Sequence, residues 1–166
     1  MLTSKEWRQL SAEQLETIEG FQQSYPVKVG GLAKAFGLRV LLKPLPAKIS
    51  GEIRPSTESE AGFDIGVNRF EKNTRQRFTI AHEIGHFLLH SHLIGGGITD
   101  TVLYRSRLSN RMEAEANRMA ADILMPAKLI RKISSDLKIP LTEEFVDEFA
   151  EALQVSVQAM KIRLGV

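Results

Sequence analysis

Apolar residues recur at helix and strand spacings through the first half of the chain. Ser11-Ala-Glu-Gln14 is a capping-box pattern, which predicts a helix from about Ala12. The run Leu38–Leu42 predicts a strand, and Ile49–Ile53 and Phe63–Val67 are shorter strand candidates separated by a polar loop. The pattern therefore predicts an N-terminal helical stretch followed by the strands of a small sheet.

Helical periodicity dominates the second half of the chain. Apolar segments predict one helix at about Asn73–His90 and another at Arg111–Met125, which stops before a proline. Between them, the consecutive glycines 95–97 predict a loop that leads into a short strand at Thr101–Arg105. The remainder, Ala127–Val166, predicts helices with one break. This mixture indicates an α+β fold, in which a small antiparallel or mixed sheet packs on helices.

The chain of 166 residues is long enough to bury a core, and its 43% hydrophobic and 25% charged residues are ordinary for a globular protein. We predict a main domain over residues 1–126 and a C-terminal helical subdomain over residues 127–166, packed on the first. The chain shows no apolar run of membrane-spanning length and no signal peptide. A cytoplasmic protein is the simplest interpretation, although a cysteine-free secreted protein stays open.

The candidate chemistry lies in the predicted helix Asn73–His90. Residues His82-Glu-Ile-Gly-His86 form a His-Glu-x-x-His motif. Histidines four apart on a helix project from one face about 6 Å apart, so that two imidazole nitrogens can meet on one zinc ion. The intervening Glu83 stands beside the metal, where it can take a proton from the attacking water. Because the chain has no cysteine, any further ligand is a nitrogen or an oxygen.

A packed or surface histidine pair, with Glu83 as a solvated salt-bridge partner, is the competing interpretation. The surrounding segment Phe78–Leu89 is otherwise almost entirely apolar, and burying imidazoles and a carboxylate there is costly unless they are paired or bind a metal. Gly85 costs a helix roughly 1 kcal/mol relative to alanine, which suggests that another element packs closely against it. We therefore predict a metal-dependent hydrolase, with a peptide bond as the favoured substrate.

A catalytic zinc usually has three protein ligands, so a third one is needed. His90 lies eight residues beyond His82, about 12 Å along a regular helix, which is too far to share the same ion. His92 matches the third histidine of a longer zinc motif, but Leu89 stands where that motif needs a glycine. We therefore expect His90 and His92 to cap or pack the end of the helix.

The predicted helix Arg111–Met125 offers Glu113 and Glu115 as ligands. Glu113 shares a face with small and apolar residues, which would let this helix pack close to the motif helix. Glu115 shares a face with charged residues, which is typical of a solvated position. Glu113 is thus the better ligand, and Asn117, one turn later, could orient it. The competing interpretation is that both glutamates are surface charges.

These motifs together resemble the ImmA/IrrE family of zinc metallopeptidases. The resemblance rests on Arg75–His90, on Glu113-x-Glu-Ala-Asn117 and on Ile123–Pro126, and it extends over about residues 28–130. One departure is Met119, where most members are expected to carry an aromatic residue. Such a difference would affect packing more than chemistry.

The resemblance implies a zincin-like fold, a Zn²⁺ cofactor held by His82, His86 and Glu113, and Glu83 as the general base. It also implies an intracellular protease that acts on a protein substrate. Members of the family typically cleave a helix-turn-helix repressor and so switch on phage, mobile-element or stress genes. Tyr104 and Arg105 are candidates for stabilising the oxyanion, and the strand that carries them could bind an extended peptide.

A DNA-binding or antitoxin-like regulator that keeps the zinc site without proteolysis is the alternative. Residues 145–164 have the pattern of a helix, a turn and a second helix capped by Ser156. However, residues 127–166 hold six Lys or Arg against six Asp or Glu, whereas a DNA-binding surface is normally basic. The whole-chain charge of only +2 points the same way. A nucleic-acid partner is therefore not expected, and the sequence does not indicate an oligomeric state.

Overall fold

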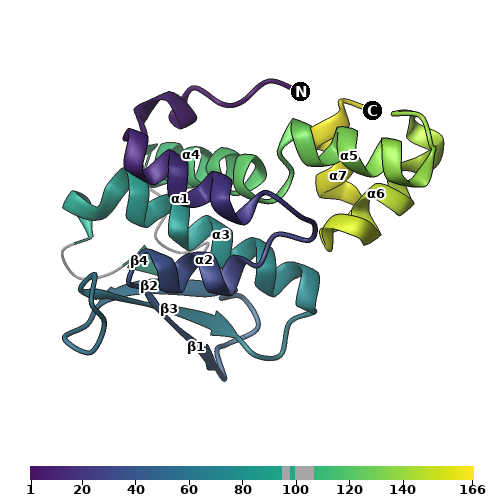
Figure 1. Ribbon diagram of the computed structural model, residues 1–166. Helices are drawn as coiled ribbons and strands as arrows, with labels where there is room; N and C mark the ends of the chain where they lie inside the picture. The colour runs from purple at the N-terminus through teal and green to yellow at the C-terminus, as the bar shows by residue number, and fades with distance from the viewer. Residues whose placement is uncertain (95–97, 100–106) are drawn as a thin grey trace.

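A computed structural model describes residues 1–94, 98–99 and 107–166 of the chain (Figure 1). The fold is α+β, as predicted. The strands are β1 (Arg39–Lys43), β2 (Gly51–Pro55), β3 (Phe63–Asn68) and β4 (Ile98–Thr99). The α-helices are α1 (Ala12–Phe21), α2 (Val29–Ala35), α3 (Asn73–His90), α4 (Arg107–Leu124), α5 (Ala127–Leu137), α6 (Val146–Leu153) and α7 (Val157–Leu164). Short 3-10 helices are η1 (Glu6–Gln9), η2 (Ser91–Leu93) and η4 (Glu143–Phe145).

The strands form a mixed sheet in the order β1-β3-β2-β4. β1 runs parallel to β3, and β2 pairs antiparallel with both β3 and β4. Ile53 of β2 lies opposite Ile65 of β3, and both side chains are buried. The sheet is therefore the mixed form of the two that the sequence predicts.

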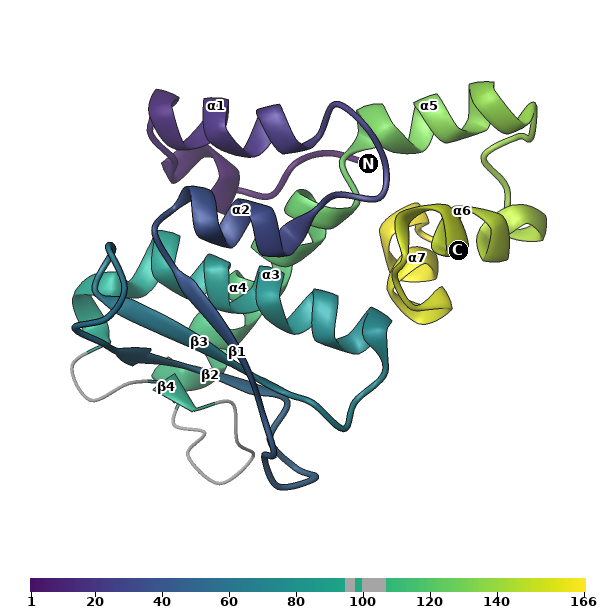
Figure 2. The ribbon, with the colours of Figure 1, turned by 60° about the horizontal axis from the view of Figure 1, so that its bottom comes forward.

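Helices α2 and α3 lie on one face of this sheet, as Figures 1 and 2 show. Ile84 of α3 is fully buried and joins Ile53 and Ile65 in the core between the helices and the strands. On β1, by contrast, Leu42 is largely exposed. The core thus occupies one side of the sheet and fixes the motif helix against β2 and β3.

Helix α4 packs beside α3 at very short range. A Cβ added at Gly85 would lie 3.1 Å from the carbonyl oxygen of Ala116 and 3.3 Å from the Cβ of Met119. The close packing expected at Gly85 is therefore present, and α4 is the element that makes it. Met119 is itself fully buried in the core.

Helix starts follow the local sequence signals. Ser11 caps α1 through the reciprocal hydrogen bonds of a capping box with Gln14, as predicted. Ser156 caps α7 by accepting a hydrogen bond from the backbone N–H of Ala159. Helix α3 has the predicted bounds, whereas α4 begins at Arg107, about one turn earlier than predicted. The glycine loop at 95–97 and the strand at Thr101–Arg105 lie outside the described residues.

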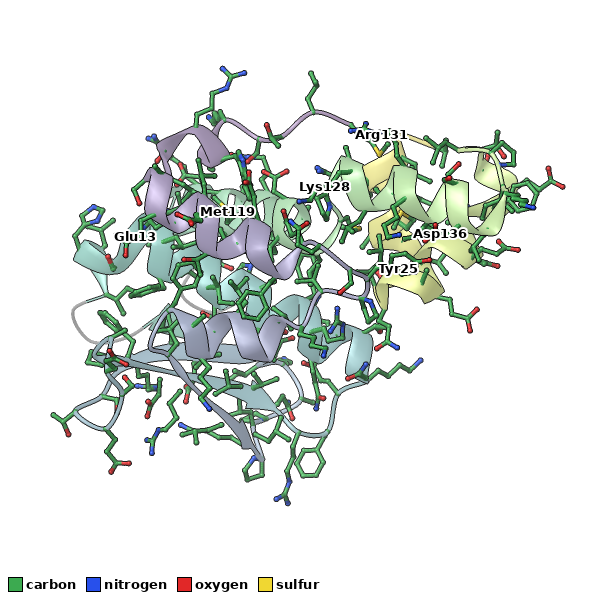
Figure 3. All side chains as sticks on the ribbon, in the orientation of Figure 1. Glu13, Tyr25, Met119, Lys128, Arg131 and Asp136 are labelled. Carbon is green, nitrogen blue, oxygen red and sulfur yellow. The ribbon has the colours of Figure 1, made fainter. Side chains whose placement is uncertain are left out.

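Helices α5, α6 and α7 gather beyond the end of α4 (Figure 2). Arg163 of α7 reaches back to α4, where it contacts the Asp122 carboxylate at 3.1 Å and donates to the Met125 carbonyl. The Tyr25 hydroxyl points toward Asp136 of α5 and lies 3.0 Å from it (Figure 3). Side-chain contacts therefore tie this group to the rest of the protein. Among the described helices, none has the length and apolarity needed to cross a membrane.

Candidate metal centre

His82 and His86 come from consecutive turns of α3 and face α4. Their rings lie edge to face, with centroids 4.7 Å apart. Both are almost completely buried, because α4 covers the face of α3 from which they project. Helical geometry alone places them together, as the spacing of four residues predicts.

Glu113 of α4 lies opposite both histidines. Its Oε2 is 3.0 Å from His82 Nε2, and its Oε1 is 2.8 Å from His86 Nε2. The potential ligand atoms of these three residues all lie within 4.8 Å of one another, so that the group could hold one metal ion. Of the two candidate glutamates, the structure brings Glu113 to the histidine pair.

The second ring nitrogens of the two histidines have partners of different kinds. His82 Nδ1 is 2.8 Å from the side-chain oxygen of Asn117. Asn117 was expected to orient Glu113, but it contacts His82 instead. His86 Nδ1 is 2.9 Å from Nδ1 of His90. In both histidines, the Nε2 atom is therefore the one directed at the Glu113 carboxylate.

His90 and Glu115 form a contact that the sequence reasoning missed. His90 does lie at the end of α3, but it is buried, and its Nε2 is 2.7 Å from Glu115 Oε2. Glu115, expected on a solvated face, is only 15% exposed at its side chain and also accepts from Arg111 Nε at 3.1 Å. The sequence did contain a signal for this contact, because His90 follows His86 by the same four residues that separate the motif histidines and so lies on the same face of the helix.

Burial and hydrogen bonds together shift the pKa values of these groups. Desolvation lowers the pKa of His86, although the hydrogen bond to Glu113 acts in the opposite direction. Desolvation raises the pKa of Glu115, but the hydrogen bonds from His90 and Arg111 outweigh it, so that this pKa lies below its usual value. His86 is therefore neutral at physiological pH, which is the form that binds metals.

Glu83 follows His82 in α3 and lies against Gly51 of β2. Its side chain is fully buried, and its Oε1 would be 3.6 Å from a Cβ built on Gly51. Such a Cβ would also lie 2.3 Å from Thr79 Cγ2 and 2.8 Å from the Gly66 carbonyl oxygen. Because only a glycine fits here, α3 can approach the sheet closely where Glu83 is held.

A cleft of about 600 Å³ opens beside His82 and Glu113. Its walls come from α3, α4, α7 and the segment before β2. The apolar part is lined by Phe78, Ala121, Met125, Ala159 and Ile162, and the polar part by Lys48, Ser50, Thr74, Arg75, Thr79, Asn117, Arg118, Ser156 and Gln158. Glu83 and His86 do not line it. The candidate metal centre thus has direct access to a space large enough for a segment of another molecule.

Tyr104 and Arg105, the candidates for stabilising an oxyanion, lie outside the described residues. Arg77, one of several basic residues near the start of α3, donates to the backbone carbonyls of Leu153 and Gln154. Its contribution is therefore to hold α6 against α3. Arg75, two residues earlier, lines the cleft and donates to the Ser50 hydroxyl.

Comparison with known proteins identifies the class to which this fold and centre belong. Residues 33–165 match the family Peptidase_M78, described as the IrrE N-terminal-like domain. The chain belongs to this family, which is named as a family of peptidases. No curated protein matches the chain.

A solved structure shares the fold. It is a Mycobacterium tuberculosis transcriptional regulator, with a TM-score of 0.59 and 16% sequence identity. The similarity covers 96% of this chain and 49% of the regulator, so this chain spans about half the length of that protein. At this identity, the likeness concerns the fold alone.

Proposed function

We propose that the protein is a zinc-dependent endopeptidase with a zincin-like main domain over residues 1–126 and a helical subdomain over residues 127–166. The observation that carries the proposal is the convergence of His82 Nε2, His86 Nε2 and the Glu113 carboxylate beside a cleft. Two imidazoles and one carboxylate are a common ligand set of catalytic zinc, which keeps its fourth position for water or substrate.

The surrounding contacts fit a metal at this point. Metal-binding histidines usually engage their other ring nitrogen with a hydrogen-bonding partner, which fixes the orientation of the ring. Here Asn117 and His90 occupy those positions on His82 and His86. Both Nε2 atoms are thereby left to face the centre.

Each residue then has a defined task. His82, His86 and Glu113 would hold the ion, which, when bound, supplies a Lewis acid and an acidified water. Glu83 accepts a proton from the attacking water and returns it to the leaving amine, which makes it the general base and then the general acid. Its confinement between α3 and Gly51 fixes where the carboxylate lies. Stabilisation of the oxyanion by Tyr104 or Arg105 stays a prediction.

The cleft is the proposed binding place of the substrate. It has apolar wall residues, such as Phe78 and Ile162, beside the cations Lys48 and Arg75, and a protein segment offers complementary groups of both kinds. The family resemblance favours a helix-turn-helix repressor as that substrate, with release of phage, mobile-element or stress genes as the result. Such a substrate would place the enzyme in the cytoplasm.

The test is incubation with the repressor encoded nearest to this gene. Zinc-loaded wild-type protein should cleave it, and a chelator should stop the cleavage. Glu83→Gln should keep one zinc per chain, measured by elemental analysis, yet cleave roughly 100- to 10,000-fold more slowly. Cleavage by Glu83→Gln at the wild-type rate would remove Glu83 as the base. A zinc-loaded wild type that cleaves no repressor would favour the regulator described next.

A DNA-binding regulator is the second candidate, favoured by the two short helices α6 and α7 joined by a tight turn. The cations of α7 have other partners, however: Lys161 lies 3.3 Å from Glu143, and Arg163 contacts Asp122. DNA binding should therefore be weak and insensitive to Lys161→Ala. Salt-dependent binding that falls sharply in this variant would support the regulator instead.

A further inference from the structure

The candidate ligand His86 stands at the start of a chain of hydrogen bonds that runs from the buried metal centre to the exposed Arg111. From His86, the contacts pass through the facing Nδ1 atoms to His90, then from His90 Nε2 to Glu115, and finally from Glu115 to Arg111. The separations are 2.9, 2.7 and 3.1 Å. His90 is 4% exposed, so water cannot readily take the place of either partner.

The chemistry of Glu115 gives this chain a direction. An ionised carboxylate only accepts hydrogen bonds, and Arg111 supplies a cation that favours the ionised form. His90 Nε2 must therefore carry the hydrogen that is donated to Glu115. In a neutral imidazole the other nitrogen then has the lone pair, so His90 Nδ1 accepts from His86 Nδ1–H. His86 Nε2 is then left with the lone pair, which is the form that would bind a metal ion lying between His86 and Glu113.

His82 has a partner of a different kind at Nδ1. Its Nδ1 faces the Asn117 side chain, and an amide offers either an oxygen acceptor or an NH₂ donor after a simple flip. Asn117 can therefore accommodate both tautomers of His82. The hydrogen bonds from His86 end instead at the Glu115 carboxylate, which only accepts, so they allow only one tautomer of His86.

We propose that His90 and Glu115 are positioning residues that set the tautomer and ring orientation of His86 for metal binding. This inference rests on the proposed zinc site. Hydrogen-bonding partners of ligands typically contribute 10- to 100-fold to metal affinity. Loss of the acceptor at position 90 therefore weakens zinc binding by roughly that factor, although His90 itself does not bind the ion.

The experiment measures the dissociation constant for Zn²⁺ by competition with a chelating dye. His90→Leu fills the buried space but removes the acceptor, and zinc binding should weaken roughly 10- to 100-fold. His90→Asn places an amide oxygen near the position of Nδ1 and should recover most of the affinity. His92→Leu is the matched control, because His92 is exposed on η2, and it should bind zinc like the wild type.

Thermal unfolding of the metal-free proteins separates positioning from packing. Leucine suits a buried position better than asparagine, so His90→Leu should be the more stable of the two variants, while it binds zinc more weakly. If zinc affinity followed stability instead, the role of His90 would be structural. The absorption spectrum of bound Co²⁺ should also change in His90→Leu and not in His92→Leu.

Glu115→Gln keeps the proposal testable if both His90 variants fail to fold. Its amide no longer dictates the direction of the chain, and zinc binding should weaken about tenfold. If folded His90→Leu or Glu115→Gln bound zinc with wild-type affinity, the positioning role of His90 and Glu115 would be wrong, while the proposed zinc site would still stand. If the wild-type protein bound no zinc, the proposed function would be wrong, and the positioning role would be wrong with it.

Discussion

Helix α4 carries polar residues on two faces, and the two faces use them differently. On one face, Glu113 and Asn117 point toward the histidines of α3. On the other, Arg118 binds Glu6 near the N-terminus, and Asp122 binds Arg163 of α7. Both pairs are four residues apart, so each makes a continuous stripe along the helix.

The difference lies in how charge is balanced. The Glu6 and Asp122 carboxylates are fully buried, and each accepts a hydrogen bond from an arginine. That face, which we call the clamp face, holds the two ends of the chain against α4 through the Glu6–Arg118 and Asp122–Arg163 pairs. On the Glu113 face, a carboxylate meets two imidazoles, one of which burial keeps neutral. A divalent cation would complete this set, and no further protein cation is needed there.

The largest effect on folding should come from Asp122→Ala. The change leaves the buried Arg163 guanidinium without its carboxylate and removes the acceptor for Ser4. Breaking one side of a buried ion pair costs about 3–5 kcal/mol, which urea unfolding would measure. Zinc affinity of the folded fraction should be unchanged.

The control for this change is Glu143→Ala, which removes the exposed Glu143–Lys161 pair. Exposed pairs contribute roughly 1 kcal/mol or less. If both substitutions cost the same free energy of unfolding, the face of α4 that contains Asp122 is not the clamp described above.

Glu113→Gln should weaken zinc binding and leave the stability of the metal-free protein nearly unchanged, which is the opposite of the effect of Asp122→Ala. Structural zinc sites with four ligands bind with roughly 10–16 kcal/mol, so one ligand contributes about 3–4 kcal/mol, or a few hundredfold in affinity. The metal-free protein should unfold at nearly the wild-type urea concentration, because glutamine keeps the shape of the side chain and can still hydrogen-bond to His82 and His86. Retained zinc affinity would exclude Glu113 as a ligand, and reduced stability without metal would mean that both faces are structural.

This contrast also explains what the sequence could predict. The bounds of α3, the capping of α1 and the face of α4 on which Glu113 lies depend on residues within a few turns of one another, so local sequence patterns can predict them. The partner of Glu115 could not be read in this way. Its helical neighbours are charged, which suggested solvent, whereas its contact is His90, 25 residues earlier in the chain.

Long-range pairing is also why the clamps on α4 were not predicted. Glu6 and Arg118 are 112 residues apart, and Asp122 and Arg163 are 41 apart. Each looks like an ordinary surface charge until the helices are packed. Asn117 shows that a nearby contact can be missed as well. It lies on the same face of α4 as Glu113, as predicted, but its partner is His82 and not Glu113.

Glu6→Gln should reveal the clamp through the pH dependence of stability. The hydrogen bond from Arg118 is the main cause that lowers the pKa of Glu6 from 4.5 to about 2. A carboxyl with a lowered pKa in the folded state stabilises the protein above its unfolded pKa, and this contribution disappears as the pH falls through the folded pKa. The wild type should therefore exceed the variant by about 2 kcal/mol near neutral pH.

That difference should shrink as the pH falls from 4.5 toward 2. Urea unfolding of both proteins across this interval would measure it. A difference that is constant with pH would show that Glu6 acts through packing alone. Zinc affinity at neutral pH serves as the internal control and should be the same in both proteins, since Glu6 lies on the clamp face.

The smallest effect expected is that of Gly85→Ala, which changes the spacing between α3 and α4. Alanine favours a helix by about 1 kcal/mol over glycine, but the new methyl would lie 3.1–3.2 Å from backbone atoms of Ala116, which cannot rotate away. Overpacking typically costs about 1–3 kcal/mol, so the net result should be a loss of about 1 kcal/mol.

Gly20→Ala in α1, where a Cβ meets nothing within 4 Å, should stabilise the protein instead. Because Gly85 sits between the two histidines and the helix that carries Glu113, its variant should also bind zinc more weakly, whereas Gly20→Ala should not. A Gly85→Ala protein as stable as Gly20→Ala, with wild-type zinc affinity, would show that the close approach of the two helices is not what holds the three ligands together.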